Sequence, residues 1–306
     1  MKNMTQYLTA CLMIATLAVA CEVTRSENNA AKGGDTTDTG EVEQLDESLV
    51  NLFVSLEKQA IEALDAEELV RARQLTDKGL HKTQKAGRKY ELYEARFSLL
   101  KGKLEQIKGS TGEARRFFGD AMAVFRIRKN IPGTFEVRLA QATLEESGGD
   151  FAAAQRELDE AEKLLSQIDS ANLKVEFTFK QAELFASQMK QQEAARLFLD
   201  AAEQFHANKN ASREADAYVA LATCEEALEK PQESKNSLNK AYKIYLAAKD
   251  KEGAVKALHR LAQFSVREEK YKTAREQFKQ VEALYLQLGR QSDATKVNQH
   301  IAALPE

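Results

Sequence analysis

Residues 255–294 read VKALHRLAQFSVREEKYKTAREQFKQVEALYLQLGRQSDA. Within this stretch, Ala274, Phe278, Val281 and Tyr285 follow one another at steps of four, three and four residues. These steps place all four side chains on one face of a helix, because an α-helix turns once in 3.6 residues. The pattern predicts an amphipathic helix whose apolar face packs against neighbouring helices.

The same face recurs with a period of 40 residues in five segments, which begin near Ala95, Phe135, Val175, Ala215 and Val255. One column of large apolar residues consists of Phe118, Leu158, Phe198, Leu238 and Phe278. A second large column consists of Phe125, Leu165, Phe205, Tyr245 and Tyr285. Internal repetition at such a period is typical of helical arrays.

Small residues form further columns with the same period. One lies in the first helix of each segment and consists of Gly102, Ala142, Ala182, Ala222 and Ala262. Another opens the second helix and consists of Ala114, Ala154, Ala194, Ser234 and Ala274. Small residues let helix axes approach closely, and large side chains fill the neighbouring grooves. Since one hairpin cannot bury its own apolar face, the sequence predicts an all-α fold, an α-solenoid in which helix-turn-helix repeats stack into a superhelix.

Turn signals fall in register with these columns. Gly148–Phe151 marks a short turn inside one hairpin, and the glycines suit a helix end. Asn130–Gly133 and Asp250–Gly253 lie between repeats. We expect these connections between repeats to be longer than the turns inside hairpins.

The columns and turns resemble the tetratricopeptide repeat (TPR), which has a small residue in helix A, a Gly-Asp-Tyr-like turn, and alanine, aromatic and alanine positions in helix B. The nearest matches are residues 268–278, EEKYKTAREQF, and residues 148–154, GGDFAAA. The standard repeat has about 34 residues. This chain therefore resembles the long variant of some bacterial regulators and motor light chains.

The resemblance covers residues 95–294 and extends to an expected domain at 45–306. An irregular first hairpin is expected near Leu45–Ala86 and a capping helix near Ser292–Leu304, which makes about six hairpins and a cap. The resemblance implies that helix A of each repeat lines a concave groove. Such a groove binds other proteins or peptides.

Residues 1–20 resemble the signal peptide of a bacterial lipoprotein. The apolar run Leu8–Ala20 is too short to span a bilayer but suits a signal peptide. It ends in small residues directly before Cys21, which resembles a lipobox and implies that Cys21 carries the acyl chains. Cys11 has the better-matching residues before it but leaves almost no apolar run. An ordinary cleaved signal, with Cys21 incidental, is the alternative.

The residue after the lipidated cysteine directs sorting in that family. Glu22, in place of aspartate, implies the outer membrane, with the protein facing the periplasm. Residues 21–44 are rich in Glu, Asp, Thr, Asn, Gly and Ser. Such a segment buries too little apolar surface to offset its ordering entropy, so a disordered acidic tether is predicted. Its r.m.s. reach is about 25 to 30 Å.

The candidate partner-binding residues occupy one position of helix A in successive repeats, namely Arg96, Glu136, Glu176, Asp216 and Lys256. Glu146, Glu183 and Glu226 lie near them. One interpretation is a groove with an acidic centre and basic ends that accepts a peptide with central Lys or Arg. The other is an ordinary solvated helix face.

Other sites are not expected. The net charge of −3 does not favour nucleic acid as a partner, and the four histidines lack metal-ligand spacing. No nucleophile, base and orienting residue are grouped, so neither an enzyme nor a cofactor is expected. Cys224 occupies a column of buried apolar residues, Leu104, Leu144, Leu184 and Phe264.

Two functions remain open. The first is a membrane-anchored scaffold or adaptor of the bacterial cell envelope, which binds partner proteins through the concave surface. The second is a signalling receptor whose solenoid binds a short peptide and changes curvature.

Overall fold

The computed structural model describes residues 45–65 and 68–305. The predicted signal peptide, Cys21 and the tether lie outside these residues. The chain divides into two compact units, Met1–Lys180 and Gln181–Glu306, so α9 contributes to both. We call them unit 1 and unit 2 and describe each by itself.

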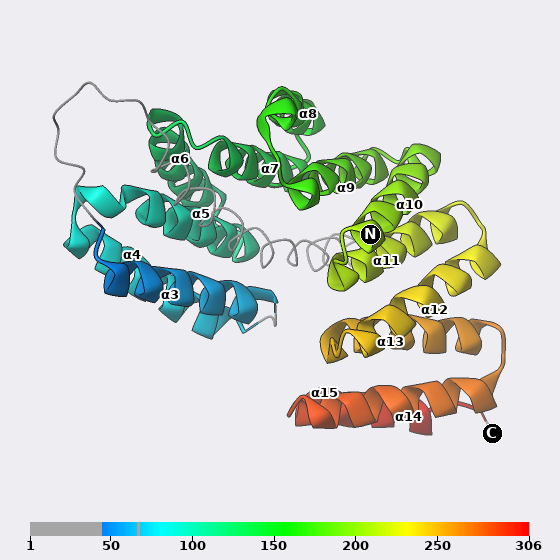
Figure 1. Cartoon of the computed structure of the whole chain (residues 1–306). Coiled ribbons are helices and arrows are strands. Elements are labelled where there is room, and N and C mark those ends of the chain that lie inside the picture. The colour runs from blue at the N-terminus through cyan, green and yellow to red at the C-terminus, as the bar shows by residue number, and fades with distance from the viewer. Residues whose placement is uncertain (1–44, 66–67, 306) are drawn as a thin grey trace, which may run out of the picture. The chain divides into compact units, whose positions relative to one another are not determined.

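The described residues form thirteen α-helices, two short 3-10 helices and no strand. The helices that begin in unit 1 are α3 (Glu47–Asp65), α4 (Leu69–Ala86), η1 (Arg88–Tyr90), α5 (Glu91–Ile107), α6 (Thr111–Ile127), α7 (Ile131–Ser147), α8 (Phe151–Glu162), η2 (Leu165–Gln167) and α9 (Ala171–Ser187). Unit 2 contains α10 (Gln191–Ala207), α11 (Ala211–Ala227), α12 (Pro231–Ala247), α13 (Lys251–Arg267), α14 (Tyr271–Gln287) and α15 (Gln291–Ala302). Within each unit, sequential helices pack in antiparallel pairs (Figure 1).

From α5 onward, successive helices begin 20 residues apart. Most have 17 residues and are followed by a three-residue turn, so two helices and two turns make up the 40-residue period. The turn after α12 is representative: the Asp250 amide donates to the Tyr245 carbonyl at 2.9 Å, and the Lys249 amide donates to the Leu246 carbonyl at 3.1 Å. This pair of hydrogen bonds is the Schellman motif, which satisfies the last helix carbonyls. The expectation of longer turns between repeats is wrong for the turns after α6, α10 and α12, but it is confirmed between α8 and α9, where residues 163–170 include η2.

The Asn and Asp residues that suggested longer turns cap the next helix instead. The Asp250 side chain accepts from the Gly253 amide at 2.8 Å, and the Asn130 side chain accepts from the Gly133 amide at 2.7 Å. A side chain at this position satisfies a backbone donor that has no partner inside the helix. At these two positions the turn between repeats therefore has the same three-residue length as the turns within repeats.

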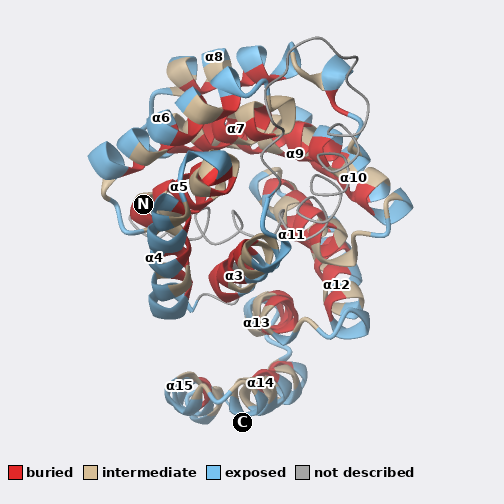
Figure 2. Cartoon of the chain, turned by 60° about the vertical axis from the view of Figure 1, so that its left-hand side comes forward, coloured by how far each residue is buried: buried red, intermediate tan, exposed pale blue. Residues whose placement is uncertain are grey.

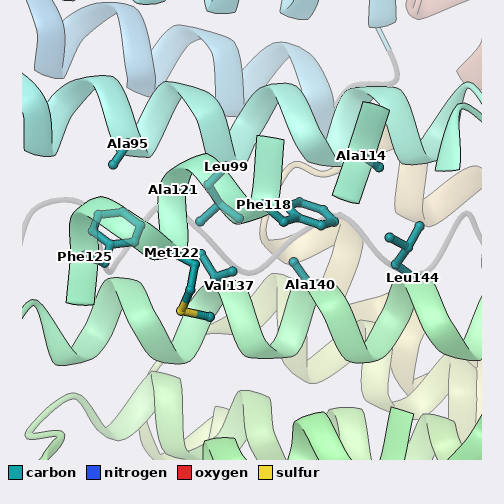
Figure 3. Close-up of a cluster of buried hydrophobic side chains, with 10 residues drawn as sticks. All are labelled: Ala95, Leu99, Ala114, Phe118, Ala121, Met122, Phe125, Val137, Ala140 and Leu144. Carbon is teal, nitrogen blue, oxygen red and sulfur yellow. The ribbon is translucent and has the colours of Figure 1, made fainter. Parts of the chain in front are cut away.

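The core of unit 1 confirms the predicted columns. Figure 3 shows Phe118 of α6 between residues of α5 and α7, including Leu99 and Ala140. Phe118 is fully buried. Gly102 of α5 explains this close packing, because a Cβ there would lie only 2.4 Å from the Phe118 ring.

Unit 2 is built in the same way. Phe198, Leu238 and Phe278 are at most 4% exposed, and the following alanine column is buried as well. A Cβ on Gly253 of α13 would lie 2.3 Å from the Tyr245 ring of α12, which places these helices in close contact. Cys224 is 1% exposed, as its apolar column predicts.

The second large column fails at Leu165. Helix α8 ends at Glu162, and the chain continues as η2, in which the Ile168 amide bonds to the Leu165 carbonyl three residues earlier. This tighter turn rotates the chain, so Leu165 is only half-buried while Ile168 is 1% exposed. Tyr285 is also half-buried, and the Arg290 guanidinium lies 5.1 Å from its ring centroid.

Candidate partner-binding face

Five of the six predicted partner-binding residues are the sixth residue of their helix: Arg96 in α5, Glu136 in α7, Glu176 in α9, Asp216 in α11 and Lys256 in α13. The equivalence that the period predicts is therefore confirmed. The environments differ. Glu136 and Lys256 are half-buried, whereas the other two acids are buried.

In unit 1, Arg96 pairs with a residue that the sequence did not single out. Its Nε donates to Oε1 of Glu57 on α3 at 2.7 Å, and the two side chains are 13% and 6% exposed. Burying an ion pair to this extent costs desolvation free energy. Removing only one partner costs more, because it leaves an uncompensated buried charge. Arg96 therefore joins α5 to α3.

A small cavity of about 20 Å³ lies beside this pair and is lined by Glu57, Arg96, Lys103 and Glu136, among others. That volume suits about one water molecule and excludes a larger ligand. Burial raises the pKa of Glu57, Arg96 opposes that shift, and the nearby Glu136 charge adds to it. The geometry assigns these residues an internal electrostatic role.

Helix α9 carries two of the predicted residues. Glu176 and Glu183 are each 3% exposed. Carboxylates this deeply buried need internal partners. They do not form the solvent-facing acidic surface that the sequence suggested.

Asp216 of unit 2 is 4% exposed. Its Oδ2 accepts from Nη1 of Arg213 at 3.0 Å, and its Oδ1 accepts from the Tyr245 hydroxyl at 2.5 Å. The Arg213 guanidinium also lies 5.3 Å from the centroid of the Phe205 ring. Burial raises the pKa of Asp216 to about 6, against the lowering effects of Arg213 and Tyr245.

For Asp216 the prediction of an open groove carboxylate is therefore wrong. The physical reason is Arg213, which lies three residues earlier on the same helix. Arg213 is a cation that is only 2% exposed, and Asp216 neutralises it. Glu136, Glu176 and Asp216 thus do not make an open acidic row, because two of the three are buried.

A larger cavity lies at the other end of unit 2, among α11, α13, α14 and α15. It has a volume of about 520 Å³ and is lined by residues that include Glu226, Gln263, Arg267, Phe278, His300 and Leu304. Ligand pockets have volumes of about 300 to 1,000 Å³, so this one is of ligand size. We call it the α13–α15 pocket.

The charged groups of the α13–α15 pocket are fixed by one another. Glu226 accepts hydrogen bonds from Nη2 of Arg260 at 2.9 Å and from Nη1 of Arg267 at 2.6 Å. Burial alone would raise the pKa of Glu226, but these two hydrogen bonds outweigh it and lower the pKa. Glu226 stays ionised and holds two guanidinium groups in place beside the pocket.

Phe278 is the aromatic residue of the pocket lining, beside Val266 and Leu304. Two imidazoles approach its ring edge to face: the His259 centroid lies 5.4 Å away and the His300 centroid lies 6.3 Å away. Burial lowers the pKa of His259, and the neighbouring His300 adds to the effect. The pocket lining therefore combines the Phe278 ring, the Arg267 cation that Glu226 holds and the His300 imidazole.

Sequence reasoning named Glu226 but missed Arg260, Arg267 and His300. Arg267 does not recur in the other repeats, where the same position is Ile107, Ser147, Ser187 and Ala227. A search for columns finds residues that repeat, and this pocket is made by residues that do not. A residue that differs in type from the other members of its column, as Arg267 does, would have been the useful signal for this pocket.

Among residues 45–65 and 68–305, no group of three or more His, Cys, Asp and Glu side chains is arranged to hold a metal ion. In the same part of the chain, no helix combines the length and apolar composition needed to cross a bilayer.

The family model described as soluble NSF attachment protein, SNAP, matches residues 160–304. A search of curated proteins found no match. The chain thus has a family match over its C-terminal part.

Solved structures match over most of the chain. A Rap protein complexed with competence and sporulation factor is similar with a TM-score of 0.64 at 16% identity, over 96% of this chain and 78% of that one. Aspartyl phosphate phosphatase F from Bacillus subtilis is similar with a TM-score of 0.59 at 14% identity, over 95% and 76%.

A third structure is the signal transduction ATPase with numerous domains (STAND) from Pyrococcus horikoshii, which has a tetratricopeptide repeat sensor. It is similar with a TM-score of 0.62 at 12% identity and covers 81% of this chain, which spans only 40% of that protein. Identities this low bear on the fold, and the fold agrees with the 40-residue helical repeat described above. The chain therefore has the fold of the TPR-type helical repeat proteins.

Proposed function

We propose that this chain is a TPR-type scaffold that binds other proteins. The observation that carries the proposal is the α13–α15 pocket, which is of ligand size and is lined by residues from four helices. Stacked repeats bury their own core and present extended surfaces for partners. In this pocket Glu226 is committed to two arginines, an arrangement suited to recognition rather than to proton transfer. We therefore propose a binding protein and not an enzyme.

The finer proposal is a scaffold or adaptor of the bacterial cell envelope, lipid-anchored through Cys21 at the outer membrane and facing the periplasm. It rests on the lipobox-like residues before Cys21 and on Glu22 after it. Multiple acyl chains would hold the protein firmly, since each buried CH₂ contributes about 0.8 kcal/mol.

The experiment is in-cell crosslinking followed by purification of the tagged chain and identification of its partners. We expect one defined protein complex in the membrane fraction. In a Cys21→Ser variant, we expect the chain to leave that fraction or to keep its signal peptide. A variant that still fractionates with membranes as a mature, acylated protein would contradict the anchoring proposal.

A peptide-binding signalling receptor is the second candidate. The observation that favours it is the match over 96% of this chain to a Rap protein that was solved with competence and sporulation factor. A thermal-shift screen of peptides separates the candidates. A single peptide that raises the melting temperature and changes the hydrodynamic radius would favour the receptor, whereas a stable protein complex would favour the scaffold.

A further inference from the structure

Helix α4 carries the most basic surface of unit 1. Residues 69–90 contain seven Lys and Arg and one Asp, a net charge of +6 in a chain whose total is −3. Ala72, Thr76, Gly79 and Thr83 form the buried side of α4. Lys78, Lys82 and Lys85 follow one another at steps of four and three residues and are all exposed, so they share the solvent side. We call these three residues the α4 basic strip (Figure 2 shows that side of the helix in pale blue).

The strip is not neutralised by its surroundings. Asp77 is the only acid of this segment, and it already pairs with Lys101 of α5 at 2.5 Å. Arg71 and Arg73 on the same helix pair with Glu68 and Glu105. Within the part of the chain that the structure describes, no carboxylate pairs with the three lysines of the strip. Their charges therefore face solvent without a counter-charge.

The strip also lies close to the point where the N-terminal segment enters the fold. The Asp46 amide donates to the Tyr90 hydroxyl at 3.0 Å. Hydrogen bonds from Ser48 lower the pKa of the Asp46 carboxyl, and the nearby Lys89 charge adds to that effect. Tyr90 is 1% exposed and packs in the core against Phe53, so this hydrogen bond joins residue 46 to a core side chain. Residue 46 is thus held against η1, the short helix that follows the C-terminal end of α4.

We propose that the α4 basic strip docks on an anionic phospholipid surface. The proposal rests on the proposed lipid anchor, because an acyl chain at Cys21 would keep residue 46 within about 25 to 30 Å of the bilayer. Each Lys near an anionic bilayer contributes about 1 kcal/mol of attraction, and the effect fades with salt. The docked strip would hold unit 1 against the membrane in one orientation.

A bilayer is favoured over nucleic acid by the geometry of attachment. The strip is a single row of lysines on one short helix, and the acid-rich residues 22–44 lie upstream of it in the chain. A chain anchored upstream of the strip meets the bilayer at high effective concentration, which a nucleic acid in solution does not share.

The test uses the chain from Glu22 onward, which keeps every described residue and carries no acyl group. Its binding is measured by co-sedimentation with phosphatidylcholine vesicles that contain about one third phosphatidylglycerol, at about 0.05 M and about 0.5 M salt. We expect binding at low salt that is lost at high salt. The K78E/K82E/K85E variant should bind about 100-fold more weakly.

The matched control is K243E/K272E/K279E, which makes the same charge change at three exposed lysines of unit 2. It should keep binding within about threefold of the parent. K78Q/K82Q/K85Q provides a milder variant in case charge reversal perturbs folding, which circular dichroism checks. Equal loss in the control, equal binding to pure phosphatidylcholine, or binding to double-stranded DNA without binding to the anionic vesicles would each overturn the proposal. Because this assay needs neither acylation nor a protein partner, its outcome is separate from that of the proposed function.

Discussion

Two repeats place an aromatic ring at the same position and surround it differently. At the end of α6 in unit 1, Phe125 meets Gly133, where an added Cβ would lie 2.7 Å from the ring. At the end of α10 in unit 2, Phe205 meets Arg213, which occupies the equivalent position 80 residues later. Both rings are at most 1% exposed. The 40-residue period therefore determines the position of the ring. The residue that contacts the ring, Gly133 or Arg213, determines whether polar groups must also be buried.

Glycine leaves no polar group to satisfy, so the Phe125 contact needs no further residue. Arg213 places a guanidinium in the core. Its charge is met by a hydrogen bond to Asp216, which also accepts a hydrogen bond from Tyr245. A buried ion pair of this kind is a poor source of stability compared with apolar packing, but it cannot be removed one partner at a time. This difference between the two repeats gives the largest predicted effect.

Replacing Asp216 by Ala should destabilise the protein by about 3 to 5 kcal/mol, because the buried Arg213 guanidinium and Tyr245 hydroxyl then lose their shared hydrogen-bond acceptor. Urea unfolding followed by circular dichroism measures the change. The control is the double variant R213L/D216A, in which leucine is chosen because Leu173 occupies the same position in another repeat and is 3% exposed. It should recover most of the loss. A single variant as stable as the parent would show that the pair is not buried in solution.

The pH dependence of stability should separate the parent from the same double variant. Burial raises the pKa of Asp216 from 3.8 to about 6, so the folded state holds a proton that the unfolded state has released. The contribution of Asp216 is therefore present below about pH 4 and is lost as the pH rises through 6. Relative to R213L/D216A, the parent should lose stability as the pH rises from 4 to 7. A constant difference across this range would contradict the raised pKa.

Gly133→Ala tests the other repeat. The added methyl group would lie 2.7 Å from the Phe125 ring, so we expect destabilisation by about 1 to 3 kcal/mol. Gly119→Ala is the matched control in the same unit, because nothing lies within 4 Å of its added Cβ. That change should stabilise the helix by about 0.5 to 1 kcal/mol. Similar effects at both sites would mean that the ring contact is absent.

The smallest effects concern the turns, which both units share. Met189 has φ of 61°, a conformation that costs a non-glycine residue about 1 kcal/mol. Met189→Gly should therefore raise the free energy of unfolding by about that amount, and Gly149→Ala, where φ is 81°, should lower it. Thermal melts of the two variants measure these opposite shifts. Shifts of the same sign would show that the repeated turn does not persist in solution.

Much of the fold was predictable because it depends on residues that repeat. The columns through Phe118 and Ala121 determine which helix faces are buried, and the structure confirms both columns. The failure at Leu165 arises because its register depends on how α8 ends, and no periodic residue marks that change. The short turns before α7 and α13 were predicted to be longer, because Asn and Asp are common both as N-caps and in loops.

The candidate site was harder to predict for the same reason. Glu136 and Asp216 hold equivalent positions, but only Asp216 has an arginine three residues before it. Replacing the three predicted acids together would therefore remove a core ion pair, and lost binding could not be distinguished from lost folding. The α13–α15 pocket depends on Arg267 and His300, which do not recur, so only their placement in space reveals it.

Site-specific photo-crosslinking tests the proposed scaffold function most directly. A photoreactive amino acid is placed at Gln263, an exposed residue of the α13–α15 pocket, and in a second protein at Leu246, an exposed residue of α12 outside that pocket. Both chains are expressed in the native cell and irradiated. We expect one strong crosslinked protein from Gln263 and little from Leu246. Crosslinks from Leu246 alone, or none from Gln263, would contradict partner binding at this pocket.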